Sequence, residues 1–409
     1  MTQHVDEAAT STGTPPKAPE APDTPVAHGT ADTATRGTPP RRGVVVAVVA
    51  GFTALAAGVS VFGGGLLDPA ASTTDGDYAG ETVEMMIPLA EGGGTDTWAR
   101  FVAGELTHAV PGAPGLAPVN DDGGEGILGT NHFMTSAKPD GTEWLVSTAS
   151  TVVPYLLDMP AVRYDFEDLR PILANGTGAV VYARTAAGVR GVADLVDRDE
   201  PLTFGGIAAT SLDLTTLLAF DLLGADVDAT FGFEGRGPVN LALQRGEVDI
   251  DYQTTSSYGP AVDPLVKDGT AVPLFSLGQV DDDGDVVRDP NFPDLPTVVE
   301  AYEDLYGEQP PADAMRTYTA ILALTYTYQK ALWVPEDTPD EALELLRTTA
   351  DRLGQDPAFQ TSAQEVLGGY PLDASADLPE RIGEAYQVDD EVRDDVLELL
   401  EGDYDIEIG

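Results

Sequence analysis

The chain has 409 residues and a formal net charge of −48, from 69 Asp and Glu residues against 21 Lys and Arg. Such a charge repels nucleic acid and anionic lipid headgroups, which excludes both as partners. The chain has no cysteine, so disulfides, thiol nucleophiles, thiolate metal sites and a lipid-modified N-terminal cysteine are excluded too. Because the acidic residues are scattered over the whole chain, we interpret them as a surface adapted to high salt.

The first 80 residues divide into three segments. Residues 1–42 are rich in Pro, Thr, Ala and Gly and poor in large apolar side chains, which predicts a disordered cytoplasmic tail. Residues 43–67 are uncharged and long enough to span a membrane, and the pair Arg41 and Arg42 before them predicts an anchor with its N-terminus in the cytoplasm. A cleaved signal peptide is the alternative interpretation of this segment. Residues 68–80 are a predicted linker, and both interpretations export everything after it.

From residue 81 onward, short apolar runs alternate with amphipathic stretches. Strands are predicted at 81–89, 144–148, 179–184, 202–205, 228–233 and 248–252. Helices are predicted at 95–109, 212–223, 238–245, 340–353 and 380–401. The alternation predicts an α/β fold with parallel sheets covered by helices.

Residues 87–100 carry the first candidate site. A strand ends, Gly92, Gly93 and Gly94 turn the chain, and a helix begins near Thr95. The first turn of a helix has unpaired N–H groups and a partial positive charge, so it suits a carboxylate or a phosphate. No Gly-Lys-Ser/Thr follows, which excludes a P-loop. Taken alone, this pattern is equally typical of a plain tight turn.

Two further strand-to-helix turns repeat the pattern. Residues 204–211 end in Thr210 and Ser211, which either cap the next helix or donate hydroxyls to a ligand. Residues 234–238 form the third turn. We expect the three turns to face one crevice at the carboxyl ends of the strands, where open α/β sheets bind ligands.

Catalytic and metal-binding patterns are sparse. Only His108 and His132 fall in the predicted folded region, and neither a Gly-x-Ser-x-Gly elbow nor a His-Glu-x-x-His motif is present. The acidic run 281–285 fails the EF-hand template, because Pro290 stands where a glutamate is needed, so we interpret it as a solvated turn. The sequence therefore predicts no catalytic residues, no metal site and no cofactor.

With these turns in place, the sequence resembles the substrate-binding receptors of tripartite tricarboxylate transporters, also called Bug receptors. Residues 87–100 follow the family's opening segment, Val-Pro-Phe-x-Pro-Gly-Gly-x-x-Asp-x-x-Ala-Arg. Further segments resemble the family in the same order along about residues 82–375, at 123–129, 137–142, 164–172, 233–238, 246–249, 295–301 and 334–339.

The resemblance implies a type II periplasmic-binding-protein fold, with two α/β lobes and mostly parallel sheets around a ligand cleft. Lobe 1 is expected at 81–178 and lobe 2 at 179–290, with 291–409 returning to lobe 1 and the C-terminal helices. The implied ligand is a small carboxylate, either a di- or tricarboxylate or an aromatic acid, and the implied partners are membrane permease subunits. A receptor that signals to a membrane kinase is one alternative. An enzyme on the same fold is a less favoured one.

The resemblance also implies contacts with the ligand, carried over by position. From lobe 1 these are Gly92, Gly93, Gly94, Thr95, Asp96, Thr148 and Ser150; from lobe 2 they are Ala209, Thr210 and Ser211. Asp96 is open to a second interpretation, as a helix cap or as the holder of an ordered water.

Several residues depart from the family's pattern. Leu89 replaces the usual Phe at the edge of the pocket and is expected to enlarge it, and Glu91 adds a negative charge nearby. Arg236 stands where the family usually has Gly, and it either pairs with a second, distal carboxylate or is simply exposed. Asp213 replaces a residue that is often His. The span 304–330 is longer than usual, which predicts an extra helix or a docking surface.

Overall fold

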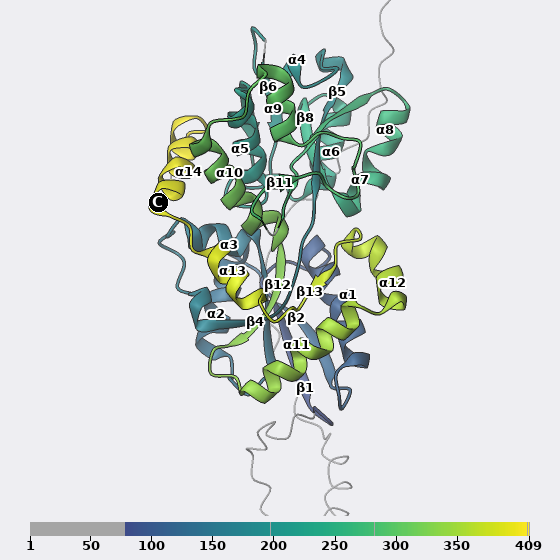
Figure 1. The fold of residues 1–409 in the computed structure, drawn as a ribbon, viewed down its shortest axis with the longest axis vertical. Helices are drawn as coiled ribbons and strands as arrows, with labels where there is room; N and C mark the ends of the chain where they lie inside the picture. Colours follow the sequence, from purple (N-terminus) through teal and green to yellow (C-terminus); the bar gives the residue numbers. More distant parts are fainter. Residues whose placement is uncertain (1–77, 197, 282, 407, 409) are drawn as a thin grey trace, which may run out of the picture. The chain divides into compact units, whose positions relative to one another are not determined.

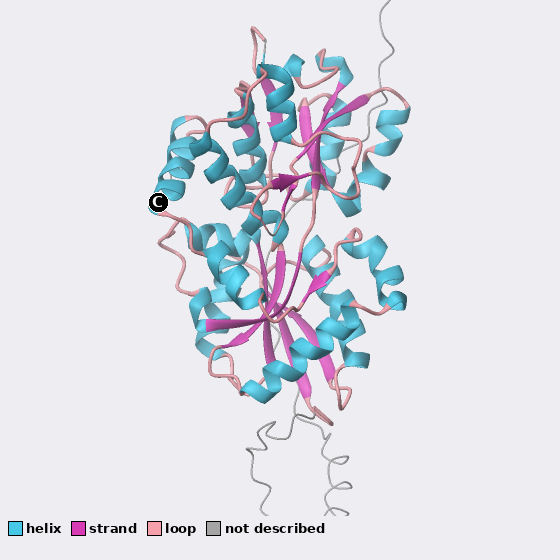
Figure 2. Cartoon of the chain, in the orientation of Figure 1, coloured by secondary structure: helices cyan, strands magenta, loops and turns pink. Residues whose placement is uncertain are grey.

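The computed structural model describes residues 78–196, 198–281, 283–406 and 408, and Figures 1 and 2 show how their elements are arranged. The predicted tail at 1–42, the predicted membrane segment at 43–67 and most of the predicted linker at 68–80 lie outside the described residues. Among the residues that are described, no helix is long and apolar enough to cross a membrane.

Lobe 1 is built on a six-stranded sheet in the order β13-β4-β12-β3-β1-β2. Its strands are β1 (Thr82–Ile87), β2 (Gly115–Asn120), β3 (Glu143–Thr148), β4 (Leu169–Asn175), β12 (Lys330–Pro335) and β13 (Leu372–Asp373). Strand β1 pairs in parallel with β2 and β3, whereas β12 runs antiparallel to β3 and β4.

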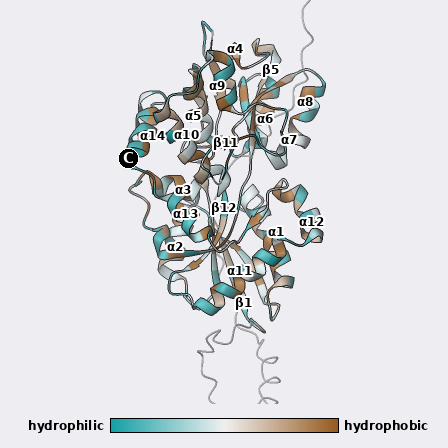
Figure 3. Ribbon diagram, viewed as in Figure 1, coloured by the Kyte–Doolittle hydropathy of each residue, from teal (hydrophilic) through white to brown (hydrophobic). Residues whose placement is uncertain are grey.

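Helices cover both faces of this sheet. One face packs on α1 (Gly94–Ala109), α11 (Asp340–Gly354) and α12 (Pro357–Leu367), and the other on α2 (Ile127–Ser136), α3 (Ala149–Leu156) and α13 (Leu378–Tyr386). Alternate residues of β1 point to opposite faces, so Met85 joins the first apolar cluster and Met86 the second. Figure 3 shows hydrophilic colour along α11, whose apolar residues Leu343 and Leu346 are buried against the sheet.

Lobe 2 is built on a five-stranded sheet in the order β7-β6-β8-β5-β9. Its strands are β5 (Ala179–Arg184), β6 (Leu202–Gly205), β7 (Val227–Thr230), β8 (Ile250–Thr254) and β9 (Ala271–Ser276). Its helices are α4 (Ala193–Val196), α5 (Asp213–Leu223), α6 (Arg236–Arg245), α7 (Thr255–Ala261), α8 (Asp263–Lys267), α9 (Val298–Tyr306) and α10 (Ala312–Leu322). A small hairpin, β10 (Gln279–Val280) and β11 (Val286–Val287), holds the acidic turn 281–285.

The predicted α/β class and the two lobes are confirmed, but the sheets are mixed rather than mostly parallel. Strands β5 and β12 run antiparallel to both of their neighbours. Each is the first strand after the chain has crossed from one lobe to the other. It therefore starts at the edge of the sheet that faces the other lobe, where the neighbouring parallel strands end.

Two crossings join the lobes, and they touch each other. Residues 176–178 connect β4 to β5, and the π-helical turn Ala323–Thr327 leads from α10 to β12. The backbone N–H of Thr177 donates to the carbonyl of Tyr326 at 2.8 Å. A Cβ atom on Gly176 would lie 3.0 Å from the carbonyl oxygen of Thr327. The first crossing is therefore fitted against the second with no room for a side chain at Gly176.

The second crossing lies later in the chain than the predicted boundary at 290. Helix α9 packs on α5 and β9, and α10 packs on α5, so both belong with lobe 2. Helix α10 and the π-helical turn fill the unusually long span 304–330.

The helix predicted at 380–401 is two helices, α13 and α14 (Asp390–Gly402). Gln387 leaves the helical conformation, at φ −96° and ψ 87°, and Asp389 is extended. The break lets α13 pack on β4 of lobe 1 while α14 packs on α10 of lobe 2.

Gly178→Ala is expected to lower the free energy of unfolding. A Cβ there would lie 1.8 Å from Oδ2 of Asp289 and 2.3 Å from the hydroxyl of Tyr370, two groups that hydrogen-bond to each other at 2.6 Å. Overpacking of this kind costs about 1–3 kcal/mol, measurable by chemical denaturation. Gly191→Ala is the control, because no atom would lie within 4 Å of its Cβ. Equal stability of the two variants would contradict the tight fit of the crossing.

Candidate functional site

A cavity of about 330 Å³ lies between the lobes, at the ends of strands from both sheets. Lobe 1 contributes the turn after β1, the turn after β3 and the first residues of β12, and lobe 2 contributes the turns after β6 and β8 and the start of α6. The crossing residues Gly176 and Thr177 form part of the lining. The cavity therefore has the position at which open α/β sheets bind ligands.

Seven of the twelve predicted contact residues line this cavity. They are Leu89, Gly94, Thr95, Thr148, Ser150, Ser211 and Arg236. The remaining five, Gly92, Gly93, Asp96, Ala209 and Thr210, belong to the same turns but are not among the lining residues. The predicted turns therefore come together, with part of each turn set back from the cavity.

The first glycine turn is held from behind by Asp96. Its Oδ2 accepts from the backbone N–H of Gly92 at 2.9 Å, and its Oδ1 accepts from Arg100 Nε at 2.8 Å and from Asn120 Nδ2 at 3.0 Å. The hydrogen bond from Arg100 is the main cause that keeps the pKa of Asp96 below its ordinary value. Asp96 thus acts on the turn rather than on the cavity, whereas Gly94 and Thr95 of the same turn line the cavity.

The matching turn of lobe 2 is held in the same way by Asp213. Its Oδ2 accepts from the backbone N–H groups of Ile207 at 2.5 Å and Ala208 at 2.9 Å, and Ser211 Oγ donates to the carbonyl of Ala208 at 2.7 Å. Asp213 is fully buried, so the residue that replaces the family's usual His is a structural acid here.

Arg236 is neither exposed nor free. Its side chain is 13% exposed, with Nη1 3.1 Å from Oδ1 of Asp251 and Nη2 3.3 Å from Oδ1 of Asp213. Its guanidinium lies 4.3 Å from the ring centre of Tyr252, close enough for a cation–π contact. The alternative of an exposed Arg236 is therefore wrong, and both of its terminal nitrogens already have carboxylate partners.

Burial outweighs ion pairing at one of the two acids beside this arginine. It raises the pKa of Asp251 to about 6, even though Arg236 acts in the opposite direction. Asp251 also accepts a hydrogen bond from the hydroxyl of Tyr182, which Asn240 engages at 2.7 Å. The guanidinium lines the cavity, and its two buried acids lie behind it.

One hydrogen bond beside the cavity joins residues of the two lobes. Glu125, in the glycine-rich stretch before α2, has its pKa raised mainly by burial and further by Asp213, while a hydrogen bond with Thr210 lowers it. Glu125 has a left-handed backbone, at φ 56°. Because Thr210 belongs to lobe 2, this contact joins the two lobes.

Fifteen of the 22 residues that line the cavity were not predicted as contacts from the sequence, and the second basic residue of the lining is one of them. Lys330 begins β12 and pairs in the sheet with Thr148 of β3 and Asn175 of β4. From the sequence, Lys330 was noted only as the end of the unusually long span 304–330, and no contact with a ligand was predicted for it. An isolated lysine just before an apolar run was the available signal, but it does not reveal which strands flank it.

The cavity is lined without any acid among the described residues. Its charged residues are Arg236 and Lys330, although the chain carries 69 Asp and Glu against 21 Lys and Arg. The rest of the lining is apolar, hydroxyl, amide or glycine, with Trp98 donating its ring N–H to Asn175 at 3.0 Å. Such a lining suits an anion with apolar parts.

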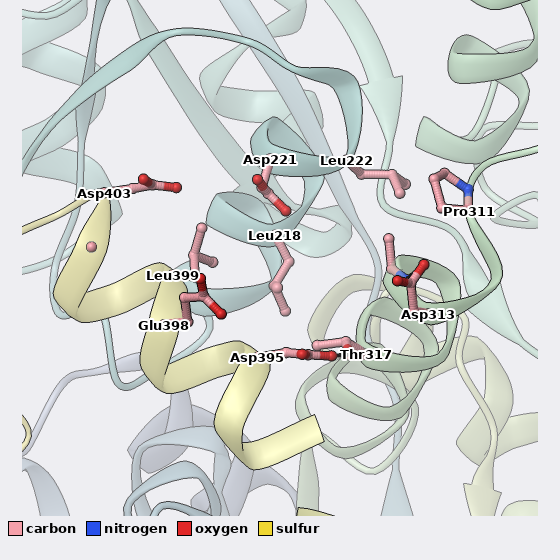
Figure 4. A pocket seen from close by; sticks show the side chains of 12 residues that line it. Leu218, Asp221, Leu222, Pro311, Asp313, Thr317, Asp395, Glu398, Leu399 and Asp403 are labelled. Carbon is pink, nitrogen blue, oxygen red and sulfur yellow. Dashed lines mark hydrogen bonds between the residues drawn. The ribbon is translucent and has the colours of Figure 1, made fainter. Parts of the chain in front are cut away.

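A second cavity, of about 450 Å³, has the opposite character. It lies between α5, α10 and α14, and Figure 4 shows five acids around it: Asp221, Asp313, Asp395, Glu398 and Asp403. Burial raises the pKa of Asp221, and the nearby Asp403 adds to the effect. Within the described part of the chain, no three His, Cys, Asp or Glu residues are grouped to hold a metal ion. This cavity repels a carboxylate, so it is not the predicted site.

Comparison with known proteins supports the predicted family. No protein-family model matches the sequence. The protein BugT of Bordetella pertussis is 26% identical over 250 residues, which cover 59% of this chain and 72% of BugT. Two solved structures share the fold, and each match covers 79% of this chain and 98% of the other chain. The periplasmic binding protein BugD is 20% identical, with a TM-score of 0.55. The R. palustris protein Rpa4515 with adipate is 21% identical, with a TM-score of 0.57. The resemblance predicted from the sequence is confirmed.

Arg236→Met is expected to lower the free energy of unfolding by about 3–5 kcal/mol at pH 8, because it leaves two buried acids without their cation. The deficit relative to wild type should shrink toward pH 5. The pKa of Asp251 is already raised by burial, and protonation below it removes the unpaired charge. Denaturant titrations at both pH values measure the change.

Arg190→Met is the matched control, because that arginine is 84% exposed and lies 3.6 Å from Asp194. Its effect should stay within about 0.5 kcal/mol. If Arg236→Met were as stable as this control, the buried ionic group would not support the fold, and Arg236 would be free for the ligand.

Proposed function

This chain is a relative of the Bug substrate-binding proteins, and we propose that it is an extracytoplasmic receptor for a small carboxylate. The ligand binds in the cavity between the lobes and is handed to the membrane subunits of a tripartite tricarboxylate-type transporter. The protein acts by binding and release, and no step of this function requires catalysis.

The observation that carries this proposal is the absence of acid from the described cavity lining in so acidic a chain. A net charge of −48 creates a field that opposes an approaching anion, although high salt screens it over a few ångströms. A cavity whose lining has no acid and includes Lys330, a lysine without a carboxylate partner among the described residues, lowers that barrier at one place. The placement favours an anionic ligand over a sugar or a cation.

The turns of both lobes supply neutral donors for the same anion. The first turn of α1 begins at Gly94, and the N–H groups of a first turn are left unpaired by the helix. Thr95, Thr148 and Ser150 add hydroxyls from lobe 1, and Ser256 and Ser257 add hydroxyls from lobe 2. Donors from both lobes explain how a ligand would favour the closed arrangement, since it contacts both sides only when they meet.

The known relatives support the class of ligand. Rpa4515 binds adipate, a flexible dicarboxylate with an apolar middle. Leu89, Val366 and Leu367 give this cavity an apolar wall of matching character. A di- or tricarboxylate or an aromatic acid fits both the charge and the wall.

The extracytoplasmic position rests on the relatives and on the sequence before the fold. BugD is a periplasmic binding protein, and this chain shares its fold. The uncharged segment 43–67 would tether the receptor to the membrane, near the permease subunits that it serves.

Full-length protein in high-salt buffer is expected to be stabilised by a carboxylate. A panel of adipate, malate, citrate and benzoate is compared with adipamide and glucose in thermal unfolding. A ligand at ~100 times its dissociation constant adds about 2.7 kcal/mol, which raises Tm by a few degrees. Stabilisation by glucose or adipamide with every carboxylate silent would contradict the proposal.

A filled cavity provides the matched control. Ser150→Leu places an apolar side chain in the cavity and should abolish the ligand-induced shift, whereas Ser136→Leu, at an exposed position on α2, should leave it unchanged. An undiminished shift in Ser150→Leu would place the ligand elsewhere.

A further inference from the structure

We infer that Lys330 supplies the positive charge that holds the carboxylate in the cleft. The inference rests on the proposed function and names the residue that confers selectivity for anions. Neither the relatives nor the sequence motifs assign a role to this position.

Lys330 lies where the second crossing meets the sheet of lobe 1. Lys330 is the first residue of β12, where the second crossing becomes a strand, and its neighbours in the sheet are Thr148 and Asn175. All three residues line the cavity. Gly176 and Thr177 of the first crossing also line the cavity, so a ligand that bridges the lobes would lie next to this point.

Among the lining residues, Lys330 is the basic residue that has no acid partner within the described chain. Arg236, the other basic residue of the lining, is neutralised by two buried acids. The ammonium of Lys330 donates to the side-chain carbonyl of Gln329, and desolvation is the one cause that shifts its protonation. No carboxylate within the described residues forms an ion pair with it. An incoming carboxylate would therefore meet a cation whose charge has no counterion.

The other described lysines show the contrast. Lys138 is 70% exposed and lies 3.0 Å from Glu143, and Lys267 is 75% exposed and lies 3.7 Å from Asp263. Both rest in water beside an acid. Lys330 alone among these three lysines lies in a cavity and has no acid beside it. Its desolvation is unfavourable, and a bound anion would offset this free energy.

Binding is then coupled to a proton. Burial lowers the pKa of Lys330 to about 7, so part of the empty protein carries a neutral amine near neutral pH. A carboxylate beside the amine raises that pKa, and the complex takes up a proton from solvent. Affinity is full below the pKa of the empty state and falls as the pH rises above it.

The remaining titratable groups around the cavity do not change charge in the same range. Arg236 stays protonated, and burial keeps the pKa of Tyr252 and of Tyr326 well above the ordinary value, so both stay neutral. Asp251 behind Arg236 has a pKa of about 6, below the range of this titration, and Glu125 is not among the residues that line the cavity. A series from pH 7 to pH 9 therefore isolates Lys330.

The test is isothermal titration calorimetry of the full-length protein with adipate and malate as probes, at constant ionic strength. From pH 7 to pH 9 the wild-type dissociation constant should rise by roughly tenfold or more. At pH 8 the heat should differ between Tris and HEPES in proportion to an uptake of about 0.9 proton per ligand. These two readouts need no variant and do not depend on how any variant folds.

Three variants complete the test. Lys330→Gln should weaken binding about 10- to 100-fold at pH 7 and remove both the pH dependence and the proton uptake. Lys330→Arg should bind without pH dependence, because a guanidinium stays charged. Lys138→Gln should behave as wild type.

The outcomes separate the two proposals. If a probe binds wild type with equal affinity at pH 7 and pH 9, and Lys330→Gln binds it as tightly, the role of Lys330 is overturned while the receptor stands. If neither probe nor any other carboxylate of the panel binds wild type, both proposals fall.

Discussion

Everything about the cleft depends on the contact between the two crossings. The hydrogen bond from Thr177 to Tyr326 and the fit of Gly176 against Thr327 fix the point at which the lobes meet. Strands β5 and β12 begin at this junction and run away from it, whereas the strands paired with them run toward the junction and end there. The turns that follow those strands consequently face one another. A ligand site arises there because the topology of both lobes directs unpaired backbone groups and short polar side chains to the same place.

The charges around the cavity between the lobes determine which class of ligand it suits. Asp96 and Asp213, the acids that hold the two principal turns, accept hydrogen bonds from backbone N–H groups, and each also pairs with an arginine. Arg236 in turn forms ion pairs with Asp213 and Asp251. What remains toward the cavity is a set of neutral donors and Lys330. The acidic character of the chain is thereby kept on its outer faces and in the cavity between α5, α10 and α14, away from the cleft.

The sequence predicted the parts of this arrangement that are local. Strands β5 and β6 have the predicted bounds, because each is a short apolar run ended by residues that break a strand. The glycine turns and seven lining residues followed from spacing and family resemblance. The parts it missed are set by distant contacts. Lys330 gains its environment from β3 and β4, more than 150 residues earlier, and the partners of Arg236 lie on two other elements. The break between α13 and α14 has no Gly or Pro to mark it, and it is dictated by the two lobes on which those helices pack.

We propose that a small carboxylate binds between the first turn of α1 and the start of β12, in contact with both lobes. The most direct measurement is a crystal structure of the full chain grown with adipate. We expect electron density for a carboxylate between the N–H groups of Gly94 and Thr95 and the ammonium of Lys330. Adipate bound only in the acid-lined cavity, or a cleft that stays without ligand at saturating concentration, would contradict it.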